Sequence, residues 1–437
     1  MNELPKQLET EVIKNKGIYI SDTVQNALDK AVILEELPHE KMLAHKLIQE
    51  AFYFAKTANY PSGTVLAAAF DLFVAAQYYR SVAHKGWYYC PVGSPTLFYP
   101  FTNICPRCML ASKFEYENAN KPESGSIGQA TSRLLSIFLN HLFEKSGKKF
   151  KVYRGSEPID MLIYDEDNNI VLLAEIKAAP LTTPALAIPS EEITESIGGN
   201  DPTPVTKHSS MNHSSLNSSD IFMFIPIIPN DNIYSYRLIN LGNANIQDRT
   251  WAYKGIQNAL DQDHNFFKDY LVFWIEAFES YKANYRVARN GEQFRTNNIF
   301  WFTNACGQPF PRPINWPRRT GTGYESVSDG KTSAGMDRTD DIKKGIYQVL
   351  KIGAEIKPTQ SHFKVKTALI SNIHAVRHYD EYLHSLEDVV WTIDKTQKAK
   401  KVRDLPEDMN IYNLFDGIIS FTQCHIRDEW IEENFVF

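Results

Sequence analysis

An amphipathic helix followed at once by three short strands most constrains the fold of this 437-residue chain. Residues 126–144 carry apolar side chains at three- and four-residue spacing, as one buried helix face requires. Strand-like runs follow at Phe150–Tyr153, Ile159–Tyr164 and Ile170–Lys177, and the polar sequence DEDNN predicts a turn between the last two. A helix followed by a three-stranded meander predicts an α/β fold with a mixed sheet flanked by helices.

The third predicted strand carries two charged residues on one face. Side chains two positions apart in a strand project to the same side, so Glu175 and Lys177 lie together, opposite the apolar residues Leu172, Ala174 and Ile176. Asp160 lies on the preceding strand, and the tight turn brings it alongside Glu175. Charges at the end of an apolar strand are costly to bury unless they have a function.

These residue types suit a hard divalent cation. Two carboxylates, with a backbone carbonyl and waters, form an oxygen-rich site for Mg²⁺ or Mn²⁺ and a poor site for zinc. A lysine beside the metal can orient or deprotonate an attacking water and balance the charge of a phosphate. A solvated strand face with a surface Glu–Lys pair would produce the same letters, and this alternative stays open.

Asp160, followed fifteen residues later by Glu175-Ile176-Lys177, resembles the motif of the PD-(D/E)XK nuclease superfamily. Pro158 stands two residues before the aspartate, where the family usually has an adjacent proline. The resemblance covers residues 126–180. It implies a restriction-endonuclease-like core, with a helix, a three-stranded meander, a crossover helix and a further strand.

The resemblance also implies roles for individual residues. Asp160 and Glu175 would hold Mg²⁺, and Lys177 would position or activate the nucleophilic water. Gln129, near the start of the preceding helix, would add a polar group to the catalytic site, with Glu144 of the same helix as the alternative. Glu157 would be a further acidic neighbour. The function implied is that of a type II restriction endonuclease, and the chain length and cysteine content are similar to those of large enzymes of the ApaLI type.

The expected crossover helix does not follow the third strand directly. A stretch rich in Ser, Asn, Thr and Pro lies in between, and we interpret residues 186–220 as a mobile loop within an insertion. Strands are predicted at Ile221–Ile228 and Asn298–Thr303. The long helix predicted at Trp251–Tyr285 is our candidate for the crossover helix.

A group of cysteines upstream has the spacing of a metal site. Cys105 and Cys108 form a CxxC pair, and Cys90 and His84 precede them, so four soft ligands fall within 25 positions. This set fits a tetrahedral structural zinc site. Other residues could replace His84 as the fourth ligand: Cys306, Cys424 or His425. Buried cysteines without a metal are the alternative, while a redox pair would need a thioredoxin-like setting that the sequence does not show.

A basic segment within an acidic chain is the candidate DNA contact. Residues 282–319 hold seven Lys or Arg residues and one acidic residue, although the whole chain has a formal net charge of −6. The candidate contacts are Arg312, Asn315, Arg318 and Arg319, whose side chains suit phosphates and base edges. A solvated basic face is the alternative.

Composition bounds the class of protein. Hydrophobic residues make up 43% and charged residues 22%, which is ordinary globular usage and excludes a disordered or fibrous chain. Five cysteines are too few for a disulfide scaffold and favour a reducing compartment. With no apolar signal core and no apolar run long enough to span a bilayer, we expect a cytoplasmic, prokaryotic protein without membrane contact.

The sequence suggests three consecutive regions. Residues 1–120 are a helical N-terminal region with the cysteine cluster, with helices predicted at 22–36, 39–57 and 62–82. Residues 121–310 are the nuclease core, and residues 311–437 a DNA-contacting and dimerisation region with helices at 340–350 and 378–386 and a strand at 365–370. We expect double-stranded DNA as substrate, a homodimer, and a cognate DNA methyltransferase as genetic partner. Two alternatives remain, a zinc-stabilised DNA-binding protein without catalysis and a repair or modification-dependent nuclease of the same superfamily.

Overall fold

The chain forms two compact units, each built from separated stretches of sequence. The computed structural model describes residues 4–8, 20–82, 87–90, 96–99, 105–111, 124–189, 220–227, 235–243, 248–290, 298–304, 334–337, 339–358, 362–376, 378–386, 389–392 and 402–437. The first unit comprises Met1–Glu35, Leu135–Ala178 and Thr339–Phe437, and the second comprises Glu36–Leu134 and Ala179–Arg338. The units therefore differ from the three consecutive regions suggested by the sequence.

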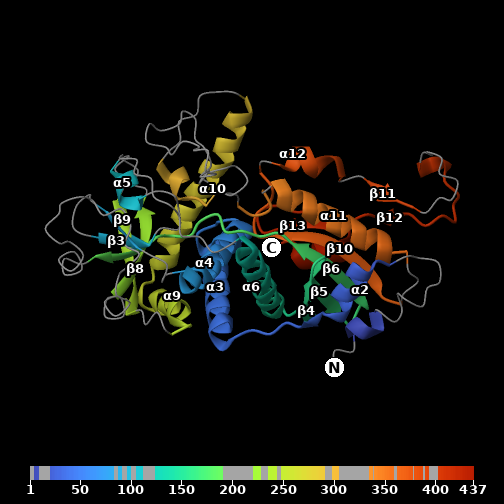
Figure 1. Cartoon of the computed structure of the whole chain (residues 1–437), viewed down its shortest axis with the longest axis horizontal. Coiled ribbons are helices and arrows are strands. Elements are labelled where there is room, and N and C mark those ends of the chain that lie inside the picture. Colours follow the sequence, from blue (N-terminus) through green and yellow to red (C-terminus); the bar gives the residue numbers. More distant parts are fainter. Residues whose placement is uncertain are drawn as a thin grey trace. The chain divides into compact units, whose positions relative to one another are not determined.

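A seven-stranded mixed sheet organises the first unit (Figure 1). Its central meander is antiparallel, and β10 then runs parallel to β6 on one side and to β13 on the other. The mixed α/β architecture is thus confirmed. In spatial order the strands are β1 (Val32–Ile33), β4 (Lys151–Ser156), β5 (Ile159–Asp165), β6 (Ile170–Ile176), β10 (Lys364–Ser371), β13 (Gly417–Ser420) and β14 (His425–Ile426).

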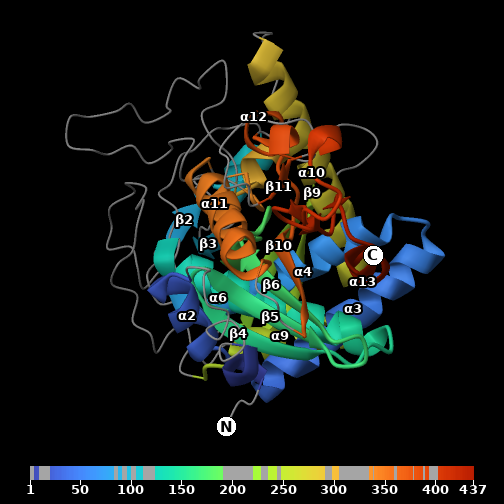
Figure 2. The same ribbon diagram turned by 90° about the vertical axis from the view of Figure 1, so that its right-hand side faces the viewer.

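The helix that leads into the parallel strand is α11 (Thr339–Ile356), which packs on β6 and β10 (Figures 1 and 2). Our assignment of the crossover helix to residues 251–285 is therefore wrong. Those residues belong to the second unit, together with the rest of the segment 179–338. A connection between parallel strands needs a helix that packs back onto its own sheet. Among the described residues between β6 and β10, α11 is the helix of this unit that does so.

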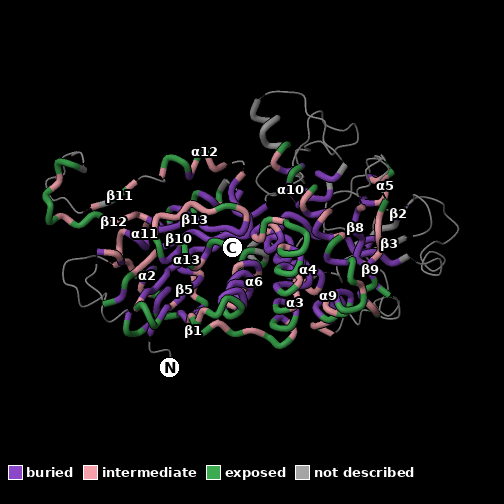
Figure 3. The backbone as a smooth tube through the Cα atoms, turned by 180° about the vertical axis from the view of Figure 1, so that it is seen from behind, coloured by how far each residue is buried: buried purple, intermediate pink, exposed green. Residues whose placement is uncertain are grey.

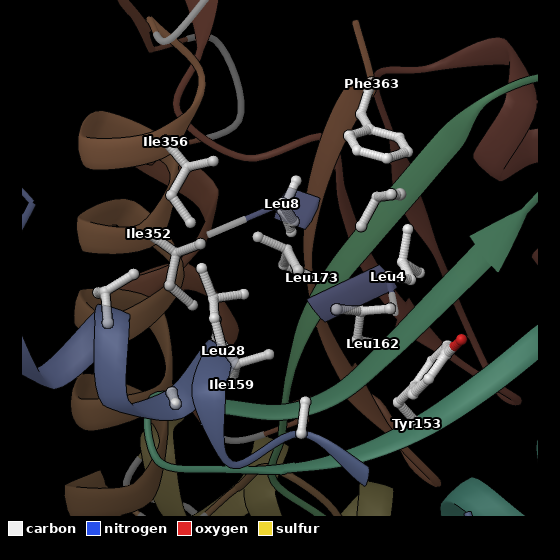
Figure 4. Close-up of a cluster of buried hydrophobic side chains, with 14 residues drawn as sticks. Leu4, Leu8, Leu28, Tyr153, Ile159, Leu162, Leu173, Ile352, Ile356 and Phe363 are labelled. Atoms are coloured by element: carbon white, nitrogen blue, oxygen red, sulfur yellow. The ribbon is translucent and has the colours of Figure 1, made fainter. Parts of the chain in front are cut away.

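Helices α2 (Asp22–Asp29) and α11 cover one face of the sheet, and their apolar side chains form the buried cluster drawn in Figure 4. Leu162 of β5 and Leu173 of β6 are register partners and pack with Leu28 and Ile352. Each such buried aliphatic side chain contributes about 1.5–3 kcal/mol to folding. The helix predicted at 22–36 is shorter than expected, because Val32 and Ile33 leave it to pair with β4.

Aromatic side chains from α6 (Ser124–Lys145) and α13 (Glu429–Phe435) complete the core of the first unit. The rings of Phe138 and Phe421 are 5.8 Å apart, and those of Phe143 and Phe435 are 5.3 Å apart. The predicted helix at 126–144 is confirmed. Every residue of β6 is buried, and Figure 3 shows the strands of this sheet largely in the buried colour. A charge on β6 is therefore held inside the protein.

The second unit combines four long helices with an antiparallel sheet. The helices predicted at 39–57 and 62–82 are confirmed as α3 and α4, and α4 is buried along most of its length. None of the described helices is both long and apolar enough to span a bilayer. The elements are α3 (Pro38–Thr57), α4 (Ser62–Val82), α9 (Trp251–Gln262), α10 (Phe266–Asn290), and the strands β2 (Tyr88–Cys90), β3 (Thr96–Tyr99), β7 (Leu186–Pro189), β8 (Asp220–Ile227) and β9 (Ser235–Asn243).

A buried carboxylate joins three parts of the second unit. Asp71 of α4 is fully buried, and its Oδ2 accepts hydrogen bonds from the backbone N–H groups of Leu181 and Thr182, at 2.7 and 3.1 Å. The indole N–H of Trp274 donates to the same oxygen at 2.7 Å. This explains the charge in the middle of the apolar α4 sequence, since it satisfies backbone donors that would otherwise be buried without an acceptor.

Further local predictions differ from the structure. The long helix at 251–285 is two helices, because Asp263 accepts the backbone N–H groups of Asn265 and Phe266 and forms a turn between α9 and α10. The strand predicted at 298–303 is a 3₁₀ helix, η2 (Asn298–Phe302), in which consecutive side chains are buried rather than alternate ones.

Another difference is at 186–220, where Leu186–Pro189 form strand β7 rather than a mobile loop; residues 190–219 lie outside the described part of the chain. The remaining elements are short. They are α5 (Pro106–Leu110), α12 (Tyr379–Tyr382) with η3 (His384–Leu386) in place of one helix at 378–386, β11 (Val390–Trp391), η4 (Val402–Asp404) and β12 (Tyr412–Asn413).

Candidate functional site

Neighbouring strands bring Asp160 and Glu175 to the same face of the first unit's sheet. The antiparallel register pairs Met161 with Ala174 and Leu162 with Leu173, so one further step along both strands sets Asp160 opposite Glu175. Asp160 Oδ2 accepts the backbone N–H of Ile176 at 3.0 Å, which fixes the carboxylate against β6. The Glu175 side chain is only 1% exposed.

Lys177 lies just beyond β6 and closes the group. Its backbone N–H donates to the carbonyl of Ile370 at 3.0 Å, and its Nζ forms an ion pair with Glu175 Oε1. Helix α11 passes close by, since a Cβ atom built on Gly345 would lie 3.1 Å from Lys177 Cγ. The structure thus brings together Asp160, Glu175 and Lys177 from two neighbouring strands, and α11 lies next to Lys177.

Burial shapes the charge state of this group. Burial and the neighbouring Asp160 charge raise the pKa of Glu175 to about 9, against the opposing effect of Lys177. Burial also raises the pKa of Asp160, although Lys177 and the Ile176 N–H oppose it. For Lys177 the attraction of Glu175 and Asp160 outweighs burial, so its pKa is raised as well. Without a cation, the group therefore retains a proton at neutral pH that separate carboxyls would have lost.

One carboxylate oxygen of this group is unsatisfied. Glu175 Oε2 is buried and has no hydrogen-bond partner among the described residues. A buried acceptor without a partner costs about 1–3 kcal/mol, and more when it is charged. Without a cation, the proton that burial favours on Glu175 relieves this cost, and a divalent cation that displaced the proton would take its place, so the donor set fits Mg²⁺ or Mn²⁺.

A third carboxylate is tied to this region from the β4–β5 turn. Glu157 Oε1 accepts a hydrogen bond of 2.5 Å from Gln348 Nε2 on α11. Both residues line a pocket of about 460 Å³, and Lys344 and Lys351 are also part of its lining. Gln348 was not among the residues predicted from the sequence. The signal was present, because Gln348 is an amide on the otherwise apolar buried face of α11.

Gln129 does not belong to the same unit as these residues. It is exposed in the N-terminal part of α6, whose first half is part of the second unit. Its role near the carboxylates stays a prediction.

The cysteine cluster lies in the second unit. Cys90 ends β2, Cys105 immediately precedes α5, and Cys108 is within α5. All three are buried, their sulfur atoms lie within 4.8 Å of one another, and Cys90 Sγ is 3.6 Å from Cys108 Sγ. That separation is far longer than the about 2.05 Å of a disulfide. Three converging thiols could bind a metal ion such as zinc.

A tetrahedral zinc site would need a fourth ligand besides these three cysteines. His84 and Cys306 both lie outside the described residues. Cys424 and His425 belong to the first unit, where the Cys424 thiol donates to the Ser420 carbonyl at 3.1 Å. The thiol cluster is therefore a three-ligand site within the part of the chain that the structure describes.

The predicted DNA contacts cannot be placed in the fold. Arg312, Asn315, Arg318 and Arg319 all lie outside the described residues. Lys282, at the start of the basic segment, pairs with Glu279 on α10 and lies over the Phe278 ring. A basic surface at 312–319 stays a prediction.

No protein-family model, no curated protein and no solved structure matches this chain.

Proposed function

We propose that this protein is a Mg²⁺-dependent endodeoxyribonuclease that cleaves double-stranded DNA at specific sequences and leaves 5′-phosphates, as type II restriction endonucleases do. One observation carries the proposal: Asp160, Glu175 and Lys177 meet on adjacent strands, and a buried Glu175 oxygen has no partner within the described residues. A buried group of this kind is expensive to maintain, which argues against a solvated strand face.

The order of elements supports the proposal. A helix, an antiparallel meander, a helix packed on the sheet and a parallel strand follow one another as α6, β4–β6, α11 and β10. This is the order that the resemblance to the PD-(D/E)XK superfamily implies, with residues 179–338 inserted after the meander.

The residues suit distinct tasks in phosphodiester hydrolysis. Asp160 and Glu175 would hold Mg²⁺, which when bound polarises the scissile phosphate and lowers the pKa of a water molecule. Lys177, held beside Glu175, would orient the attacking water and balance the charge of the phosphate. Glu175 would release its proton when the cation binds, since burial favours its neutral form in the absence of a counter-charge.

Structural zinc is the second part of the proposal. Cys90, Cys105 and Cys108 converge from a hairpin and a short helix, so a metal would fix β2 against α5. Cys105→Ser should lose one bound zinc per chain, measured by mass spectrometry of the metal, and should melt at a lower temperature. An unchanged zinc content would contradict this assignment.

The expected partners follow from the same activity. Cutting both strands of a palindrome calls for a two-fold homodimer, because symmetric sites require symmetric readers. A cognate DNA methyltransferase would protect host DNA. With this activity, we propose a cytoplasmic location in a prokaryote.

A DNA digest tests the activity. Plasmid and phage DNA, methylated and unmethylated, are incubated with the protein and Mg²⁺, without Mg²⁺, and with the Asp160→Ala and Glu175→Ala variants. Discrete bands that require Mg²⁺ and both carboxylates would support a sequence-specific endonuclease. A smear would support a nuclease without sequence preference, and intact DNA in every lane would refute the proposal in favour of a zinc-stabilised DNA-binding protein.

A further inference from the structure

Two histidines of the first unit meet where β10 and β13 lead into the following loops. His374 lies three residues after β10 ends at Ser371, and His425 begins β14 after the turn from β13. The two segments are joined, because the backbone N–H of His374 donates to the Thr422 hydroxyl at 2.9 Å. The centroids of the two imidazole rings are 5.0 Å apart, and the ring planes are inclined by 42°. The parallel pairing of β10 with β13 therefore brings two imidazoles together.

The imidazole of His374 is buried without a partner. His374 is only 4% exposed, and neither Nδ1 nor Nε2 has a hydrogen-bond partner among the residues that the structure describes. A neutral imidazole has one N–H donor and one acceptor lone pair, and both lose their water on folding. Each loss costs about 1–3 kcal/mol. Buried polar atoms of this kind indicate a bound water molecule or ion.

The neighbouring imidazole makes a metal ion the ligand that fits. Zinc lies about 2.0–2.1 Å from an imidazole nitrogen, and the ring centroid is about 1.1 Å behind that nitrogen, so two imidazoles on one tetrahedral ion have centroids about 5 Å apart. The separation of 5.0 Å between the His374 and His425 rings agrees with this spacing. The two rings can therefore contribute one lone pair each to a single ion.

Tyr379 of α12 orients the second imidazole. Its phenol ring stacks on His425 with the centroids 4.7 Å apart and the planes inclined by 16°. The Tyr379 hydroxyl is 3.4 Å from His425 Nδ1, where it can accept the proton of that nitrogen. Histidines that bind metals usually donate their other N–H to an oxygen in this way, which leaves Nε2 as the ligand atom. The exposed amide of Gln423, whose Nε2 is 3.1 Å from that atom, is the group that an ion would displace.

Nitrogen ligands select a different ion from the one proposed at the carboxylates. Imidazole is a preferred ligand of Zn²⁺, Ni²⁺ and Cu²⁺, whereas Mg²⁺ prefers oxygen. Two protein ligands leave the other positions of a tetrahedral ion to water molecules. His425 is only partly buried, so an ion can reach the pair from solvent.

We propose that His374 and His425 bind a late first-row transition-metal ion, with Zn²⁺ as the representative. The site uses neither the thiols of the second unit nor the carboxylates of the proposed catalytic group, so the inference does not depend on the nuclease proposal. A bound ion would fix the loop after β10 to the start of β14 and would satisfy a ring nitrogen of His374.

Calorimetric titration of the full-length protein with Zn²⁺, together with the zinc content per chain after dialysis, tests this site. The variants are His374→Phe and His425→Phe, which keep an aromatic ring in place and remove the nitrogens. Each should bind one zinc ion fewer than the wild type, or bind it at least about tenfold more weakly. The matched control is His384→Phe: His384 is exposed and also stacks on Tyr379, with the centroids 5.8 Å apart, and its variant should bind zinc as the wild type does.

The thiol site is separated from this one by Cys105→Ser, which should lose the thiol-bound zinc and keep the ion at the histidines. Equal zinc content and affinity in the wild type, His374→Phe and His425→Phe would overturn the inference. An equally large loss in His384→Phe would overturn it as well, because zinc binding would then depend on the loop as a whole. Should His374→Phe fail to fold, the comparison of His425→Phe with His384→Phe decides alone.

Discussion

Replacing Glu175 by Gln should stabilise the cation-free protein at neutral pH, although Glu175 is a proposed metal ligand. Burial and the Asp160 charge raise the pKa of Glu175 from its ordinary 4.5 to about 9. Between these two values, the folded protein must bind a proton that the unfolded chain releases. Folding stability is therefore complete below pH 4.5, and it falls as the pH rises toward 9.

The size of the effect follows from the width of that interval. Each pH unit above 4.5 costs about 1.4 kcal/mol of folding free energy, so the accumulated cost at pH 7 is about 3 kcal/mol. Glutamine has nearly the same shape and carries no titrating proton. Glu175→Gln should therefore be about 3 kcal/mol more stable than the wild type at pH 7, and the difference should widen with pH.

Urea denaturation at pH 5, 6, 7 and 8, in buffer stripped of free divalent cations, measures this difference. Addition of Mg²⁺ should reduce or reverse it, because the cation stabilises the wild type by mass action and has lost a ligand in the variant. The exposed Glu166→Gln should show no such pH-dependent gap. A Glu175→Gln protein that is less stable than the wild type at every pH would refute the reasoning, and so would a gap that does not change with pH.

Three further changes test other parts of the fold. Gly353→Ala in α11 should lower the melting temperature despite the better helix propensity of alanine, because a Cβ there would lie 2.4 Å from the carbonyl oxygen of Leu414. The matched control is Gly128→Ala in α6, where an added Cβ has nothing within 4 Å. This variant should be neutral or stabilising by about 1 kcal/mol. Burial lowers the pKa of His374 from 6.5 to about 3, so folding stability should be lost as the pH falls below 6.5. In His374→Phe, the change in unfolding free energy with pH between pH 5 and 6.5 should be smaller by about 1.4 kcal/mol per pH unit. An unchanged pH dependence would contradict this prediction. Asp71→Ala should cost more than about 3 kcal/mol in a denaturation experiment, because three buried N–H groups lose their acceptor, and a loss under 1 kcal/mol would show that water replaces the carboxylate.

Local patterns predicted the centre of the first unit well. The apolar run in Ile170–Ile176, the polar turn before it and the periodicity of α6 are each set by residues within one element, and each was found in the structure. The juxtaposition of Asp160 with Glu175 depends only on the short turn between two neighbouring strands. Their role in binding a cation stays a prediction.

Non-local pairing accounts for what the sequence did not reveal. The partner of β6 is β10, which comes after the insertion, so neither α11 nor Gln348 could be assigned to the site from spacing. The break between α9 and α10 depends on the side chain of Asp263. Residues 298–302 form a 3₁₀ helix and not a strand, because the packing buries consecutive residues. The thiol cluster needed both the β2–β3 hairpin and α5 to bring its sulfur atoms together.

The position of the insertion has a consequence for how the protein is made on the ribosome. The last residue of the second unit is Arg338, and α11 begins at Thr339, so the second unit can be complete while β6 still lacks its neighbour β10. Until residues 364–371 emerge, β6 is an edge strand with apolar residues that α11 has not yet covered. A nascent chain is therefore exposed to wrong strand pairing for the whole time that the insertion is being synthesised, and a product that stops before Thr339 never escapes that state.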